Sequence, residues 1–199
     1  LNWGHGGWVY FFTRQGASTV ADVKKVKMFA MAGNDKWVQL WKSNGYSPVA
    51  LATTDLFTGL ETRMIDGFNT TPLLALTLRW YHLTPNMVGL GMAPLVGGLV
   101  MTKKAWDKIS KPDQAKVLAA CQRLELKLQT EVPLQDTTAV EEMKKRGLTV
   151  NVVPPAAVAE WREAAEQFAA GMRGYMVPAD ILDMARRERD AYRNRAGGG

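Results

Sequence analysis

The fold of this chain is decided by the stretch VKMFAMAGN at residues 26–34. Two similar stretches follow it, PVALATT at residues 48–54 and MIDGFNTTP at residues 64–72. The three apolar runs are Val26–Ala32, Pro48–Ala52 and Met64–Asn69. Small polar residues follow each run, and then an amphipathic helical pattern. Strands that alternate with helices at this spacing form right-handed βαβ units. The pattern therefore predicts an α/β fold with a mostly parallel sheet flanked by helices.

The ends of these runs are the first place to look for a binding site, because parallel sheets bind ligands beyond the carboxyl ends of their strands. The polar side chains there, which we expect to contact a ligand, are Asn34, Thr53, Thr54, Asn69, Thr70 and Thr71. Three helices begin at this edge, so their free N–H groups would favour a small polar or anionic ligand. The alternative is that these residues only cap the helices.

Large apolar side chains near the same edge form the second part of the expected site. The candidates are Trp8, Tyr10, Phe29, Met31 and Trp80. Ligand cavities are mostly apolar with a few polar anchors. Seven tryptophans in 199 residues is a high number for that purpose. The alternative is that these side chains are ordinary core.

Composition and charge are typical of a globular protein and do not favour a nucleic-acid-binding or membrane-spanning one. Hydrophobic residues make up 47% of the chain and charged residues 22%, which is typical of a globular protein. Residues 186–195 carry five arginines and two acidic residues, so they supply +3 of the net charge of +6. Basic and acidic residues are mixed elsewhere, which does not favour a nucleic-acid partner. No apolar run approaches the roughly 20 residues of a membrane helix.

Residues with catalytic or cofactor chemistry are few. The chain has two histidines, His5 and His82, and no glycine-rich phosphate loop that precedes a helix. Its single cysteine, Cys121, excludes an internal disulfide and a multi-cysteine metal site. We expect no catalysis, no cofactor and no metal. An enzyme on a doubly wound α/β fold is an alternative that would need a titratable pair in the crevice.

Local signals predict where the helices begin. Thr19, Asn34 and one of Thr53 and Thr54 are expected N-caps. Leu56, Leu60 and Met64 would be the inward side chains of the helix after Thr54. Pro72 suits the first turn of a helix over Leu73–His82.

The second half of the chain reads as mainly helical. The spacing of apolar residues over Ser110–Gly147 predicts one long helix, with Cys121 on its apolar stripe. Pro133 lies inside it and predicts a kink or a break, because proline in a helix interior costs about 3 kcal/mol. The remaining expected elements are a strand at Leu148–Val153, helices at Ala156–Gly171 and Ala179–Arg195, and a flexible end at Gly197–Gly199. Near the start, Trp8–Phe12 reads as a strand that needs a partner on each side.

Several of these segments resemble one known family. They are Gly4–Thr13, Ala21–Phe29, Val49–Asp55, Gly59–Gly67 and Gly98–Trp106. In their order along the whole chain they resemble the DctP-like extracytoplasmic solute receptors of TRAP (tripartite ATP-independent periplasmic) transporters. The resemblance implies two α/β lobes with a ligand cleft between them and a long helix that spans both.

The resemblance also implies how the chain is divided. Residues 1–17 would be a crossing strand left from an N-terminal lobe that is largely absent, and 18–101 the α/β ligand-binding lobe. Residues 102–147 would form the inter-lobe long helix, and 148–199 a strand and the C-terminal helices. It further implies a periplasmic location and a membrane permease as partner. The apolar surface left exposed on such a fragment leads us to expect self-association.

One departure from the family concerns the ligand. Many relatives hold a substrate carboxylate with an arginine on the strand that is residues 27–32 here, and the matching position is Phe29. A second arginine would fall at Val9 or Tyr10, and the family's asparagine at Thr70 or Thr71. Either another group, from the absent lobe, neutralises the ligand, or the ligand is less anionic and more aromatic than usual for the family. We therefore expect a receptor for a small organic acid or aromatic solute. A non-catalytic interaction module that uses the basic tail is another alternative.

Overall fold

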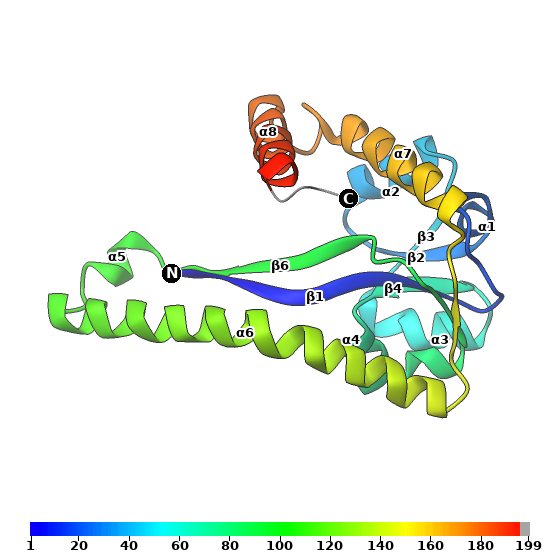
Figure 1. Ribbon diagram of the computed structural model, residues 1–199, viewed down its shortest axis with the longest axis horizontal. Coiled ribbons are helices and arrows are strands. Elements are labelled where there is room, and N and C mark those ends of the chain that lie inside the picture. Colours follow the sequence, from blue (N-terminus) through cyan, green and yellow to red (C-terminus); the bar gives the residue numbers. More distant parts are fainter. Residues whose placement is uncertain (196–199) are drawn as a thin grey trace.

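The computed structural model describes residues 1–195, which form a mixed sheet covered by helices on both faces (Figure 1). The strand order is β3-β2-β4-β1-β5-β7, and β6 pairs with β1 off this path. The strands are β1 (Asn2–Thr13), β2 (Lys27–Met31), β3 (Ser47–Leu51), β4 (Gly67–Thr70), β5 (Asn86–Val88), β6 (Ala93–Leu99) and β7 (Thr149–Asn151). The expected glycine end at 197–199 lies outside the described residues.

The three apolar runs form the expected parallel unit. β2 lies between β3 and β4 and is parallel to both, with Met28 opposite Pro48 on one side and Gly67 on the other. The third strand begins at Gly67, later than expected. Asp66 already bonds to both neighbouring segments, through its N–H to Lys27 O and its carbonyl to Arg14 N, both at 2.8 Å.

β1 is the strand that joins the two parts of the sheet. Its second half pairs antiparallel with β4 from Tyr10 to Thr13 and with β5 at Phe12 and Thr13. Its first half leaves the main sheet and pairs with β6 in a two-stranded ribbon (Figure 1). The expectation that the Trp8–Phe12 run needs a partner on each side is confirmed, and the partners are antiparallel.

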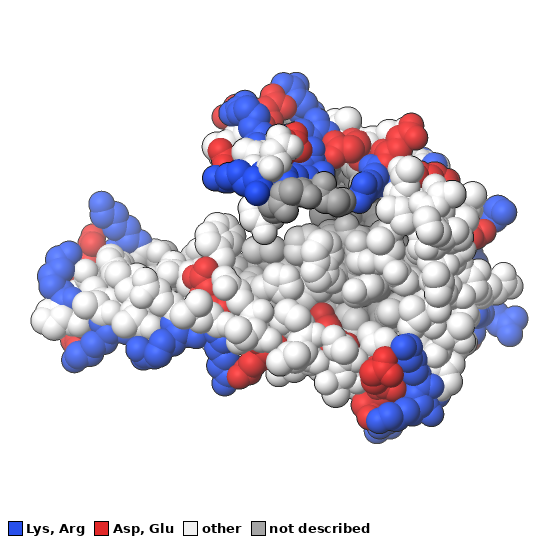
Figure 2. Space-filling model, viewed as in Figure 1, with Lys and Arg blue, Asp and Glu red and all other residues white. Residues whose placement is uncertain are grey.

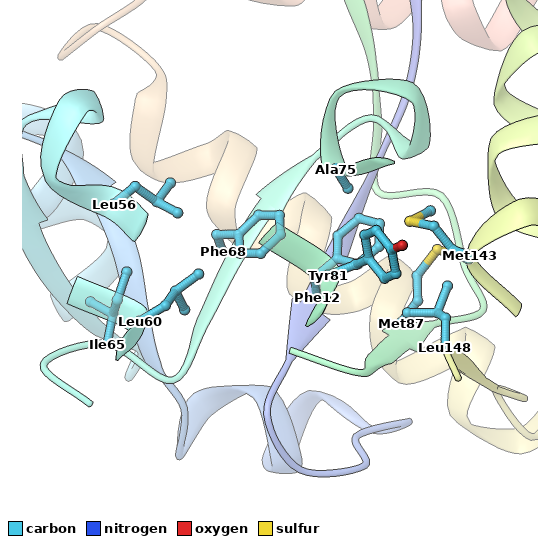
Figure 3. Packing of buried hydrophobic residues seen from close by; sticks show 10 residues of the cluster. All are labelled: Phe12, Leu56, Leu60, Ile65, Phe68, Ala75, Tyr81, Met87, Met143 and Leu148. Atoms are coloured by element: carbon cyan, nitrogen blue, oxygen red, sulfur yellow. The ribbon is translucent and has the colours of Figure 1, made fainter. Parts of the chain in front are cut away.

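Two hydrophobic cores lie on opposite faces of the sheet, because side chains alternate along a strand. Phe12 belongs to the core under α3 (Leu56–Glu61), α4 (Pro72–Thr77) and the long helix α6 (Lys111–Lys145), which Figure 3 shows from close by. Its neighbour Phe11 belongs to the core under α1 (Val20–Lys24), α2 (Asp35–Ser43) and α7 (Pro155–Met172). Both rings are buried.

The long helix is confirmed, and the break that was one of the two expected effects of Pro133 does not occur. α6 runs for 35 residues through Pro133, and its axis bends along its length (Figure 1). Ser110 caps its start by accepting a hydrogen bond from Asp113 N. Cys121 is buried, and α6 packs along β1. The remaining helices are α5 (Lys103–Trp106) and α8 (Ala179–Arg195).

Most helix starts agree with the local signals, and three details differ. Thr19 and Asn34 cap α1 and α2 with their side chains. Neither Thr53 nor Thr54 caps α3: both lie in a short 3-10 turn, Thr53–Asp55, and α3 begins after it.

The other two differences concern α3 and α4. Met64 is 52% exposed and does not point inward, because the chain turns at Arg63 with φ +58°. The helix expected over Leu73–His82 ends at Thr77. Arg79, with φ +57°, separates it from a 3-10 turn at Trp80–His82. Among the described residues, no helix has the length and apolarity to cross a membrane.

Candidate functional site

The carboxyl ends of β2, β3 and β4 meet at one edge of the sheet, since the three strands are parallel neighbours. Asn34 follows β2 there and accepts a hydrogen bond from Trp37 N at 3.2 Å, which fixes the start of α2. Thr71 follows β4 and is buried, but its hydroxyl does not cap α4. Tyr10 of β1 lies opposite Thr70 at the same edge.

Two cavities open near this edge. The larger has a volume of about 660 Å³ and lies between β1, the segment 90–94, α2 and α7. Its aromatic lining consists of Trp8, Phe11, Trp37, Trp41, Tyr46, Trp161 and Phe168. We call it the aromatic cavity. Its volume lies within the range of about 300–1,000 Å³ that is usual for small-molecule sites.

The aromatic side chains hold one another in place. Phe168 of α7 packs edge-on against Trp37 and Trp41 of α2, with ring centroids 5.3 and 5.9 Å apart. Trp41 is also edge-on to Tyr46 at 5.2 Å. Such pairs are worth about 0.5–1.5 kcal/mol beyond the area they bury. The wall of the cavity is therefore preformed by contacts between two helices.

The polar side chains that line the aromatic cavity are few. Two of them are exposed cations, Arg162 of α7 and Arg193 of α8, and the others include Asn69 of β4 and Tyr46. Burial, and then the charge of Glu160, raises the pKa of the Tyr46 phenol, so this group is neutral at physiological pH. In the view of Figure 2, charged residues gather over α8 and along α6, and the surface over β1 and β6 is largely uncharged.

The smaller cavity, of about 380 Å³, lies between β1 and α6. Its titratable lining residues are His5, Tyr10, Asp136 and Glu141. Burial raises the pKa of the Asp136 carboxyl above its usual value, against the opposing effect of hydrogen bonds from Leu73 N and Trp8 N and of nearby His5. Burial and the charge of Asp136 also raise the pKa of Tyr10.

The residues expected from the sequence divide between these places. Trp8 lines both cavities, Asn69 lines the aromatic cavity and Tyr10 the smaller one. The expected residues that line neither cavity are Phe29, Met31, Asn34, Thr53, Thr54, Thr70, Thr71 and Trp80. Phe29 and Trp80 pack against the core around Phe12.

Sequence reasoning missed most of the aromatic wall. Trp37 and Trp41 are four residues apart, which indicates a shared helix face. Nothing in the sequence indicates that Phe168 meets them, because it lies on a helix more than a hundred residues later. The sequence likewise does not indicate that Arg162 and Arg193 line the same cavity, since they lie on different helices.

Known proteins with this arrangement include solved structures of one kind, TRAP periplasmic solute-binding proteins. The protein of Desulfovibrio salexigens with bound orotic acid is 19% identical, covers 96% of this chain and has a TM-score of 0.79. That of Haemophilus influenzae RdAW with bound L-gulonate is 19% identical, covers 94% and has a TM-score of 0.81. The periplasmic ectoine-binding protein of the TeaABC TRAP transporter of Halomonas elongata is 18% identical, covers 90% and has a TM-score of 0.77.

These structures share the fold, and the chain spans 61%, 62% and 59% of their respective lengths. No curated protein matches the chain. Residues 1–173 match the family described as bacterial extracellular solute-binding protein, family 7 (DctP). That match covers most of the chain and confirms the resemblance seen in the sequence. The chain therefore belongs to family 7 of the bacterial extracellular solute-binding proteins, the DctP family.

Proposed function

We propose that this chain is the solute-binding part of a TRAP-type receptor and that its aromatic cavity takes the planar body of a small organic acid. The observation that carries the proposal is the pairing of a preformed aromatic wall with two arginines in one cavity of suitable volume. Structural relatives whose bound ligands are orotic acid and L-gulonate support the acid class. By the same family argument, we propose a periplasmic location and delivery of the solute to a membrane permease.

The chemistry of the cavity fits an aromatic carboxylate better than a sugar acid. Ring faces and edges such as those of Trp37 and Phe168 pack well on a flat apolar body and offer little to a sugar ring's hydroxyls. A guanidinium binds a carboxylate in a planar, two-bond geometry. Phe29 packs against the core. In our proposal it stands at the family's arginine position, so the neutralising charge comes from Arg162 and Arg193.

The exposed strand-end residues form a second, weaker set of proposed contacts. Asn34, Thr53 and Thr54 are exposed at the carboxyl edge, and Met31 is 55% exposed beside them. Thr70 is half-buried at the end of β4. We propose that these side chains contact the polar end of a solute that projects from the cavity.

The proposal is tested by calorimetry and thermal-shift measurements with four probes: indole-3-acetate, indole-3-acetamide, orotate and D-glucuronate. We expect indole-3-acetate to bind at least tenfold more tightly than its uncharged amide, since hydrogen bonds to charged groups contribute about 1.5–3 kcal/mol. D-Glucuronate should bind more weakly than either aromatic acid.

Variants locate the site. Trp37→Ala and Arg162→Gln should each weaken indole-3-acetate binding at least tenfold. The matched controls are Phe57→Ala, an exposed aromatic on α3, and Arg123→Gln, an exposed arginine on α6, and both should leave the affinity unchanged. Equal affinity for the acid and the amide, or equal losses in variants and controls, would contradict the proposal.

A further inference from the structure

β1 carries an irregularity just before it enters the main sheet. Its register with β6 shifts between His5 and Trp8. Gly7 lies inside this irregularity, buried, with φ +99°, a conformation that favours glycine. His5 supports it from within the strand, because its Nδ1 accepts the Gly7 N–H at 3.1 Å.

The long helix α6 contacts β1 at Gly7. Asp136 of α6 is 9% exposed, and a Cβ added to Gly7 would overlap its Oδ2 atom. The same Cβ would also stand 3.2 Å from Thr71 Cγ2. The left-handed glycine therefore leaves the space that the carboxylate occupies between β1 and α4.

Asp136 thereby lies against two separate backbone segments. Its Oδ1 accepts the Leu73 N–H at 3.2 Å, in the first turn of α4, where the Thr71 side chain makes no cap. The backbone N–H of Trp8, the residue after Gly7, lies near enough to the same carboxylate to lower its pKa. A single carboxylate thus caps one helix and lies against the bulge of β1. The Leu73 N–H would otherwise be one of the unpaired groups of a helix start.

We infer that Asp136 is a positioning residue that fixes the bulge of β1 and thereby sets the Trp8 ring at the mouth of the aromatic cavity. One face of the ring lies against Gly91, since a Cβ there would lie 3.0 Å from Trp8 Cε3, and 45% of Trp8 stays exposed. Trp8 lines both the aromatic cavity and the cavity that holds Asp136. The link between Asp136 and solute affinity rests on the proposed function, and the link between Asp136 and Trp8 does not.

The direct test measures the two amides that Asp136 is inferred to hold. Hydrogen exchange at Trp8 N–H and Leu73 N–H should be at least tenfold faster in Asp136→Ala than in the wild type. Asp136→Asn keeps one acceptor oxygen, so it should restore protection at one of the two amides. The matched control is Glu131→Ala, which removes the same charge from an exposed position on the same helix, and it should change neither rate.

The second readout follows the Trp8 ring itself. In chain labelled with 5-fluorotryptophan, the 19F resonance that disappears in Trp8→Phe is assigned to Trp8. Asp136→Ala should shift and broaden this resonance and leave the other six in place. A purely structural role would shift several of the seven resonances together or none, and either result would overturn the inference.

A double-variant cycle keeps the inference testable if Asp136→Ala folds poorly. Gly7→Ala should speed Trp8 exchange strongly in the wild-type background, where its methyl meets the carboxylate. It should do so much less in the Asp136→Asn background, because the weaker amide contact can be displaced more easily, and least in Asp136→Ala. Equal effects of Gly7→Ala in all backgrounds would contradict a contact at this point.

Binding of indole-3-acetate separates this inference from the proposed function. If the wild type binds the probe, Asp136→Ala should weaken binding at least threefold and Glu131→Ala should not. If the wild type does not bind it, but the Trp8 resonance and amide respond as described, the proposed function fails and the positioning role holds. If the probe binds and neither Trp8 readout responds to Asp136→Ala, the positioning role fails alone.

Discussion

Replacing Gly67 by alanine should test how tightly β4 is packed between β1 and β2 at the point where it begins. Gly67 opens β4, opposite Thr13 of β1 and Met28 of β2. A Cβ at this position would lie 2.8 Å from the carbonyl oxygen of Phe12 and 2.9 Å from Val26 Cγ1. Real Cβ atoms do not come so close, so the neighbours have to move.

The size of the effect follows from what can move. Val26 can relieve its contact by a small side-chain adjustment. The Phe12 carbonyl cannot, because it belongs to a fully buried residue of a strand that pairs on both sides at this point. Overpacking costs about 1–3 kcal/mol when side chains yield, and we expect the upper end, about 3 kcal/mol, when backbone is involved. For a chain of this length that is a fall in Tm of roughly 6–12 °C.

The measurement is urea unfolding at 25 °C together with a thermal scan, and Gly97→Ala is the matched control. Gly97 is also a strand glycine, on β6, but a Cβ added there meets no atom within 4 Å. That control should leave stability unchanged or raise it by about 0.4–1 kcal/mol, through the unfolded state. A loss below about 1 kcal/mol for Gly67→Ala, or equal losses for both variants, would refute the reasoning.

Three further predictions concern stability, pH and association. The Tyr81 hydroxyl lies in the core around Phe12, on the side of Met87 and Met143 (Figure 3), and has no partner among the described residues. Tyr81→Phe should therefore raise the free energy of unfolding by about 1 kcal/mol, and a loss would contradict this. The pKa of Asp136 is raised in the folded state, so folding favours the protonated carboxyl. The stability of the wild type relative to Asp136→Asn is therefore greatest below the pKa of the unfolded chain and declines as the pH rises through the pKa of the folded chain. Urea titrations from pH 3 to 7 measure that difference, which must not grow with pH. Val96 is 54% exposed on the uncharged β6 strand, so sedimentation should show self-association that Val96→Lys reduces, and a monomeric wild type would rule this out.

The sequence was sufficient for those parts of the fold that depend on neighbours along the chain. Strand runs with polar residues and helices after them predicted the parallel order of β2, β3 and β4. Thr19, Asn34 and Ser110 cap helices because each needs only an N–H two or three residues later. These features are local, so short-range patterns are enough to find them.

The parts that the sequence did not predict depend on contacts between distant segments. The antiparallel pairing of β1 joins Tyr10 to Thr70, and no turn signal links the two. The helix over Leu73–His82 ends early because Arg79 turns left-handed, which no glycine or proline marks. The aromatic cavity forms where α7 meets α2, so its wall becomes visible only in three dimensions.

The two arginines of the cavity are not held equally firmly, and this decides which should matter more. Arg193 lies on α8, whose described ion pairs to α7 include Arg186 and Arg189 with Glu166. Those pairs are largely exposed, and exposed pairs contribute about 0–1 kcal/mol each and weaken with salt.

Arg162, by contrast, follows Trp161, which is 5% exposed, stacks on Phe11 and donates its indole N–H to Ser18 O at 3.0 Å. Its backbone position is therefore fixed by a buried anchor, whereas the placement of Arg193 depends on ion pairs that salt screens. A fixed backbone leaves only side-chain freedom to be lost when the guanidinium binds a carboxylate. We therefore expect Arg162 to make the larger contribution to solute affinity, and the contribution of Arg193 to fade first as salt is raised.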